Sequence, residues 1–89
     1  MTKVSNMTSS RGNATPNQFE IETKLGVYFQ SYSTIIAFRP FDGSGVQLDK
    51  ESWDYSTTTG KYRNLFLRET KKETEKKIKD GTYKLTNLN

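Results

Sequence analysis

Basic residues gather in the last third of the chain, where they could bind an anionic partner. Residues 61–89 contain nine Lys or Arg and four Asp or Glu, whereas residues 1–60 contain five basic and six acidic residues. The net charge is therefore +5 in the last third and −1 in the rest, within a total of +4. Such an asymmetry favours an anionic partner, of which nucleic acid is the commonest.

Three lysines of this region have the spacing of one helix face. Lys72, Lys76 and Lys79 stand at i, i+4 and i+7, so a helix places them side by side. Ammonium groups on a rod can contact successive phosphates and give weak, salt-sensitive binding. The predicted nucleic-acid-binding or partner-binding residues are Lys61, Arg63, Arg68, Lys71, Lys72, Lys76 and Lys79.

The same lysines could instead belong to an ordinary solvated helix. Glu73 and Lys77, and likewise Glu75 and Lys79, have the i, i+4 spacing of ion pairs that stabilise exposed helices. Such pairs would neutralise part of the positive charge and leave the helix without a binding role.

A run of hydroxyl residues is a second candidate site. The N–H groups at a helix N-terminus, together with hydroxyls and the nearby Lys61 and Arg63, can bind phosphate or an acidic side chain. One hydroxyl must cap the helix, and the others could bond only to local backbone. The candidate anion site consists of Ser56, Thr57, Thr58 and Thr59.

The residue types that the chain lacks argue against catalysis. There is no Cys and no His, which excludes thiolate nucleophiles, disulfides, Cys/His zinc sites and the usual general base near neutral pH. Asp49, Glu51 and Asp54 could bind a hard cation, but they lack the spacing of a calcium loop, and Asp49 is more simply explained as a cap. We therefore expect a protein that is not an enzyme, with no metal and no cofactor.

The pattern of apolar residues predicts an α+β fold. Alternation and β-forming residues predict strands at 19–22, 27–30, 34–39 and 46–48. A helical period begins near Thr58, with Tyr62, Leu65, Phe66 and Glu69 on one face. A capping box of Thr70 and Glu73 starts a second helix that runs to about Asp80, where Gly81 ends it, and 82–86 could return as an edge strand. We expect a small antiparallel sheet of three to four strands followed by two helices packed on one side.

Residues 18–89 are predicted to form one domain, preceded by a polar N-terminal arm over residues 1–17 that could pack on it. The predicted core aromatics are Phe19, Phe29, Phe38, Trp53, Tyr62 and Phe66. Four tyrosines could pack a ring with the hydroxyl in solvent, stack on bases or anchor a protein interface. They are Tyr28, Tyr32, Tyr55 and Tyr83.

Several short runs resemble those of a known group of small proteins. They are Ser10-Arg11-Gly12-Asn13, Asn17-Gln18-Phe19, Phe29-Gln30-Ser31-Tyr32 and Trp53-Asp54-Tyr55-Ser56-x-Thr58-Thr59-x-Lys61-Tyr62-Arg63-Asn64-x-Phe66-Leu67. In this order they resemble uncharacterised proteins encoded by bacteriophages and mobile elements, over roughly residues 9–89. The resemblance implies a phage or mobile-element origin and a folded unit that includes residues 11–17. It assigns no functional residue.

Two functions agree with these observations. The first is a small non-enzymatic phage-type accessory protein that binds DNA or RNA through its basic helical third. The second is a phage-encoded inhibitor of a host protein, such as a component of a CRISPR-type antiviral defence. No segment is long and apolar enough to span a bilayer, and residues 1–8 do not resemble a secretory signal. We therefore expect a protein of the host cytoplasm without a membrane partner. The sequence is also compatible with a homodimer.

Overall fold

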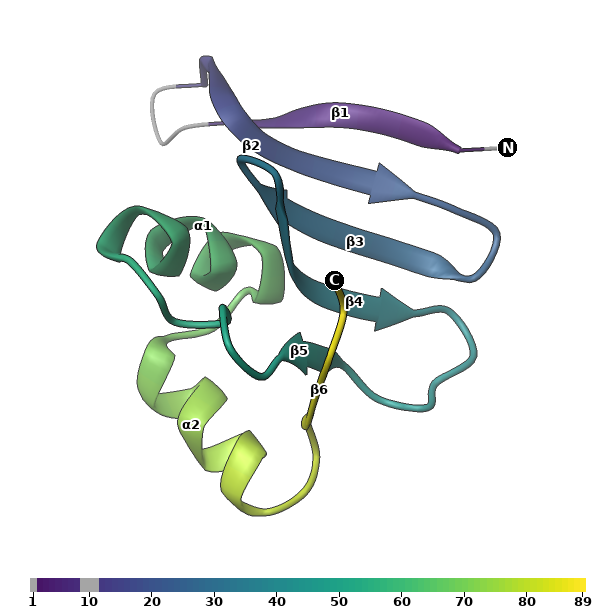
Figure 1. Ribbon diagram of the computed structural model, residues 1–89, viewed down its shortest axis with the longest axis vertical. Coiled ribbons are helices and arrows are strands. Elements are labelled where there is room, and N and C mark those ends of the chain that lie inside the picture. The colour runs from purple at the N-terminus through teal and green to yellow at the C-terminus, as the bar shows by residue number, and fades with distance from the viewer. Residues whose placement is uncertain (1, 9–11) are drawn as a thin grey trace.

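The computed structural model describes residues 2–8 and 12–89, and within them the chain forms six strands and two helices (Figure 1). The elements are β1 (Lys3–Thr8), β2 (Ala14–Glu22), β3 (Gly26–Ser31), β4 (Thr34–Pro40), β5 (Gln47–Asp49), α1 (Thr57–Leu67), α2 (Lys71–Lys79) and β6 (Lys84–Thr86). The predicted α+β class with two helices is confirmed.

The strands form one sheet in the order β1-β2-β3-β4-β5-β6. Neighbours are antiparallel from β1 to β5, whereas β6 is parallel to β5. The prediction of a purely antiparallel sheet of three to four strands is therefore wrong in size and in this last pairing. The reason for the parallel pair is that α1 and α2 form a crossover between β5 and β6 and return the chain in its original direction.

The N-terminal residues are part of this sheet. Composition alone predicted an arm over residues 1–17, but residues 3–6 of β1 pair with residues 19–22 of β2, and Thr8 pairs with Ala14. Met7, only 7% exposed, belongs to the core cluster. A polar edge strand is held by backbone hydrogen bonds and needs few apolar side chains, which is why composition did not reveal it. Arg11 lies outside the described residues.

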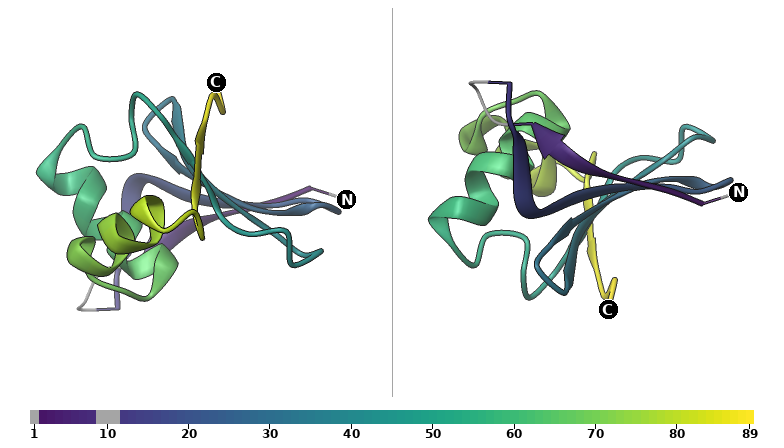
Figure 2. Two further views of the ribbon diagram at one scale, coloured as in Figure 1. Left: turned by 90° about the horizontal axis from the view of Figure 1, so that it is seen from below. Right: turned by 90° about the horizontal axis from the view of Figure 1, so that it is seen from above.

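The core lies between the two helices and the face of the sheet that they cover (Figures 1 and 2). Phe29 is fully buried on β3 and stacks on Phe66 of α1, with ring centroids 5.7 Å apart. The other buried apolar members are Met7, Val27, Ile36, Ala37, Leu48, Tyr62 and Tyr83. Of the predicted core aromatics, Phe29, Phe38, Tyr62 and Phe66 are buried, whereas Phe19 and Trp53 are only partly buried.

The opposite face of the sheet carries a second set of apolar residues. Residues directly opposite one another on adjacent strands point to the same face. One such row therefore crosses the whole sheet through Val4, Ile21, Tyr28, Phe38, Gln47 and Lys84. Tyr28 and Phe38 stack with centroids 4.3 Å apart. Since neither helix lies on this side, we call it the helix-free face.

Both predicted helix starts are confirmed. The Ser56 hydroxyl caps α1 by accepting a hydrogen bond from the Thr59 N–H. Thr70 and Glu73 form the predicted capping box of α2. Arg68, in a left-handed conformation with φ of 58°, ends α1 and turns the chain toward α2. The two helices are thus separate rods whose relative angle is set at residues 68–70.

Two glycines give a test of this packing, because adding one methyl group should have opposite effects at them. At Gly26 a Cβ would lie 2.7 Å from Phe38 Cε1 and would also overlap the Arg39 carbonyl oxygen. We expect Gly26→Ala to lower the free energy of unfolding by about 2 kcal/mol. At Gly60, inside α1, an added Cβ would make only ordinary van der Waals contacts, the nearest with Arg63 Nη2 at 3.5 Å. Gly60→Ala should therefore be neutral or stabilising by up to about 1 kcal/mol.

Urea denaturation of the two variants and the parent protein measures both effects. Equal stability of Gly26→Ala and the parent protein would contradict the packing of Phe38 over Gly26.

Candidate nucleic-acid interface

The α2 helix turns three lysines directly away from the core. Thr74 is fully buried and Ile78 is half-buried, so this side of α2 packs against the rest of the molecule. Successive residues are rotated by about 100° around a helix, which places Lys72, Lys76 and Lys79 on the opposite side. All three are exposed. We call these three residues the lysine face.

The lysine face is not paired with any described carboxylate. Within residues 2–8 and 12–89, no carboxylate oxygen lies within 4.0 Å of these three ammonium groups. Neither of the two i, i+4 ion pairs expected of an ordinary solvated helix forms among the described residues. Glu73 is used in the capping box, and Lys77 turns to Glu69 instead of Glu73. Glu75 also forms no ion pair with Lys79 among the described residues.

Three other cations of the last third are paired. Asp54 bridges both helices, because one carboxylate oxygen lies 3.0 Å from Arg63 Nη1 on α1 and the other lies 2.7 Å from Lys71 Nζ on α2. Lys77 Nζ lies 2.7 Å from Glu69 Oε1. Burial raises the pKa of Asp54, but hydrogen bonds from Lys71 and Arg63 outweigh it and hold that pKa below its ordinary value. Lys71 is thus less available to a partner than the lysine face.

Arg63 does not belong to the binding surface that the sequence predicted. Its side chain is only 1% exposed and donates hydrogen bonds to the Trp53 carbonyl and the carboxylate of Asp54 through Nη1, and to Asn64 Oδ1 through Nη2. Leu65, predicted to share a helix face with Tyr62 and Phe66, is 47% exposed, whereas those two are buried. A buried guanidinium needs several acceptors. Here Trp53 and Asp54 supply them from the loop before α1, and Asn64 supplies one from α1 itself. The sequence contains these residues, but it does not indicate that their acceptor groups surround the Arg63 guanidinium.

The remaining predicted cations, Arg68 and Lys61, lie at the helix junction and on α1. Arg68 is exposed at the junction of the two helices. Lys61 is exposed on α1, with Nζ 5.6 Å from the centroid of the Tyr62 ring. Neither forms an ion pair among the described residues. The structure therefore brings together Arg68, Lys72, Lys76 and Lys79 as accessible charges on or beside α2, with Lys61 separate from them on α1.

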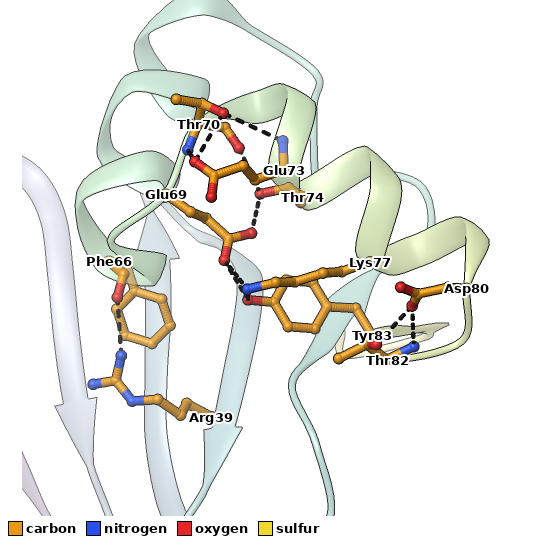
Figure 3. Close-up of polar contacts among 10 residues, drawn as sticks. All are labelled: Arg39, Phe66, Glu69, Thr70, Glu73, Thr74, Lys77, Asp80, Thr82 and Tyr83. Atoms are coloured by element: carbon orange, nitrogen blue, oxygen red, sulfur yellow. Dashed lines mark hydrogen bonds and ion pairs between the residues drawn. The ribbon is translucent and has the colours of Figure 1, made fainter.

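A buried carboxylate fixes how α2 sits (Figure 3). The Glu69 side chain is 4% exposed and accepts hydrogen bonds from Thr74 Oγ1 at 2.6 Å, Lys77 Nζ at 2.7 Å and Tyr83 Oη at 2.7 Å. Burial raises the pKa of Glu69, but these three donors outweigh burial and hold its pKa below the ordinary value. Burial and the neighbouring Glu69 raise the pKa of Tyr83. Glu69 therefore joins the helix junction, α2 and the chain after α2.

The hydroxyl run does not form the predicted four-residue anion site. Ser56 is used as the cap of α1, and Thr59 is fully buried with its hydroxyl 3.0 Å from the Ser31 hydroxyl. Only Thr57 and Thr58 are exposed. The surface hollow at this end of α1 is lined by Lys61, Arg63 and Lys71 as well as by Asp54. Arg63 and Lys71 are already paired with the Asp54 carboxylate. The hydroxyls mainly serve the fold.

The acidic residues considered for a cation are spread over separate contacts. Asp49 Oδ1 accepts from the Leu88 N–H at 3.0 Å, and Asp54 binds Arg63 and Lys71. In the part of the chain that the structure describes, no three acidic side chains come together as a metal site. No described helix is long and apolar enough to cross a bilayer.

Comparison with known families places the chain in a group without an assigned activity. A family model described as "Family of unknown function (DUF8033)" matches residues 2–81. The chain therefore belongs to the DUF8033 family. Searches of curated proteins and of solved structures gave no match. The matched span covers β1 to α2 and stops before β6, so it includes the lysine face.

The Glu69 contacts predict a pH-dependent stability. A carboxyl whose pKa is lower in the folded state stabilises the fold above its unfolded pKa, and this contribution is lost as the pH falls through the folded pKa. We expect Glu69→Gln to lower the free energy of unfolding by about 2 kcal/mol at pH 7, because Lys77 loses its charged acceptor. The difference in the free energy of unfolding between Glu69→Gln and the parent protein should shrink as the pH falls below about 4.

Glu75→Gln is the matched control, since Glu75 is exposed on α2 and outside the three ion pairs described. Thermal unfolding from pH 7 to pH 3 measures both variants. A gap that stays constant over this range, or one equally large for Glu75→Gln, would disprove the role of Glu69.

Proposed function

We propose that this chain is a small, non-enzymatic accessory protein that binds nucleic acid through the lysine face of α2. The observation that carries the proposal is that Lys72, Lys76 and Lys79 are exposed on the outward side of one helix, and form no ion pair within the described residues. Cations that only stabilised their own helix would be expected to pair with Glu73 and Glu75. Here Glu73 is used in the capping box of α2. Glu75 borders the same surface hollow as the three lysines but forms no ion pair among the described residues.

The geometry of the lysine face suits a phosphate backbone. Lys79 lies seven positions after Lys72, which at a rise of 1.5 Å per residue is about 10 Å along the helix axis. Phosphates of one strand follow one another at a rise of about 3.4 Å per nucleotide, so the face spans a few phosphates. Three contacts give weak binding, on the order of 10–100 µM, without a preference for sequence. Arg68 extends the positive surface toward the helix junction.

The cellular setting that we propose follows the resemblance to small phage and mobile-element proteins. An accessory protein of such an element would act in the host cytoplasm on DNA or RNA. The lack of His and Cys agrees with a binding role, since phosphate contacts need only fixed positive charge.

A second candidate function is inhibition of a host protein, and one observation favours it. Tyr55, 51% exposed, and Leu65, 47% exposed, border the surface hollow at the start of α1 together with Lys61. Exposed aromatic and aliphatic side chains beside a cation are typical of protein interfaces. This surface lies on α1 and its preceding loop, so it is separable from the lysine face by mutation.

Charge-matched triple variants test the proposed function. Lys72→Gln/Lys76→Gln/Lys79→Gln and Lys24→Gln/Lys50→Gln/Lys84→Gln both remove three exposed lysines and change the net charge from +4 to +1. Fluorescence anisotropy with labelled duplex and single-stranded oligonucleotides at two or more salt concentrations measures affinity. For the parent protein we expect log K to fall with log salt at a slope of roughly −3 on duplex DNA and −2 on a single strand.

The lysine-face variant should lose most of this affinity and of its salt dependence, whereas the control variant should keep both. Equal losses in the two variants would mean that net charge alone drives binding. If the parent protein does not bind or its affinity ignores salt, the proposal is wrong, and the surface around Tyr55 becomes the favoured binding site.

A further inference from the structure

The outer edge of β1 is an unprotected strand edge. β1 ends the sheet, and no described segment pairs with its outer side. Five of its six residues are exposed. Natural sheets usually protect such an edge by shortness, by charge, by proline or by a covering segment, because its free N–H and C=O groups can pair with another chain. β1 contains one charged residue, Lys3, and no proline.

The rest of the sheet is protected in these ways. β6, at the opposite edge, has three residues and carries Lys84. β4 extends beyond its pairing with β5, so the backbone groups of Ile35 have no partner on β5. The Asn89 side chain pairs with these groups instead. Its Oδ1 accepts from the Ile35 N–H at 2.8 Å, and its Nδ2 donates to the Ile35 carbonyl at 3.0 Å. An edge left open in such a molecule is a candidate interface.

Apolar surface leads up to this edge on the helix-free face. Val4 on β1 is 60% exposed and continues the row formed by Ile21, Tyr28 and Phe38. Side chains of β1 to β4 that share this face include Val4, Asn6, Phe19, Ile21, Tyr28, Gln30, Ile35 and Phe38, and none of these is charged. In a chain with a net charge of +4, this is a surface that a second copy can approach without repulsion.

We propose that β1 pairs antiparallel with β1 of a second copy, with Val4 facing the second copy's Val4 across a two-fold axis. A register that keeps the faces of both sheets aligned must pair even-numbered residues of β1 with even-numbered ones. Among such registers, Val4 on Val4 joins the two apolar rows into one. It also uses residues 2–6 and so avoids the irregularity of pairing between Asn6 and Thr8.

The charges on the other face agree with this register. Lys3 would face the second copy's Ser5, whose neighbour on β2 is Glu20. Lys3 also lies opposite Glu22 of its own β2. Each lysine at the interface therefore lies between carboxylates, and no like charges meet, as a stable pairing requires. An unrelated partner would have to supply an uncharged extended segment with the same apolar position, whereas a second copy supplies it by symmetry.

Single cysteines test the proposal, because the chain has no cysteine of its own. In the proposed register, Val4→Cys places two thiols directly opposite each other, within reach of a disulfide. Asn6→Cys places them about 14 Å apart along the strand, which is too far. Leu25→Cys, at an exposed turn position away from the edge, reports random collision.

After oxidation in a glutathione buffer, non-reducing gels should show at least about ten-fold more cross-linked dimer for Val4→Cys than for either control. Cross-linking that is equal in the three variants, or strongest for Asn6→Cys, would overturn the proposal. Circular dichroism of the reduced variants confirms that each one folds.

Sedimentation equilibrium of the cysteine-free chain gives an independent measurement. We expect a monomer–dimer equilibrium that Val4→Lys weakens at least about ten-fold, since two ammonium groups would meet at the axis. Leu25→Lys adds the same charge away from the edge and should leave the equilibrium unchanged. A parent protein that stays monomeric at every concentration, or one that Leu25→Lys disrupts equally, would overturn the proposal. This inference does not depend on the proposed binding of nucleic acid.

Discussion

The orientation of α2 depends on one buried carboxylate, Glu69. This helix has a single large apolar residue, Ile78, so burial of apolar surface alone would hold it weakly. Glu69 instead holds the helix through three hydrogen bonds, which it accepts from Thr74, Lys77 and Tyr83. Because these donors stand on the inner side of α2 and in the segment after it, the contact fixes the rotation of the helix, and the lysine face points outward as a consequence.

The same contact explains how the positive charge is divided. Lys77 binds Glu69, while Arg63 and Lys71 share Asp54, so two carboxylates pair with the three cations nearest the body of the molecule. The cations left for a partner are those that the fold does not use. If the chain also dimerises through β1, the two-fold axis lies perpendicular to the sheet and keeps the helices of both copies on the same side. Two lysine faces would then be available to one polyanion, whose affinity would exceed that of a single face.

Local features of the sequence predicted the fold better than distant contacts did. The caps at Ser56 and Thr70 depend on residues three positions away, and the strands around Val27 and Ile36 are strongly apolar, so both could be predicted. β1 was missed because its side chains are polar and its stability comes from pairing. The burial of Arg63 and the clamp at Glu69 were missed because each needs acceptors or donors from several segments. The lysine face was predicted from spacing, but only the structure showed that Glu73 and Glu75 form no ion pair with it.

The acetylation rate of each lysine tests the central claim most directly, namely that the fold divides these cations into paired and free groups. Brief treatment of the folded protein with acetic anhydride, followed by peptide mass spectrometry, gives a relative rate for each ammonium group. Lys72, Lys76 and Lys79 should react at rates near those of the unfolded chain, whereas Lys71 and Lys77 should react several-fold more slowly, because their bound carboxylates raise the pKa of each. Equal rates at all five positions, or slow reaction across the lysine face, would contradict the account.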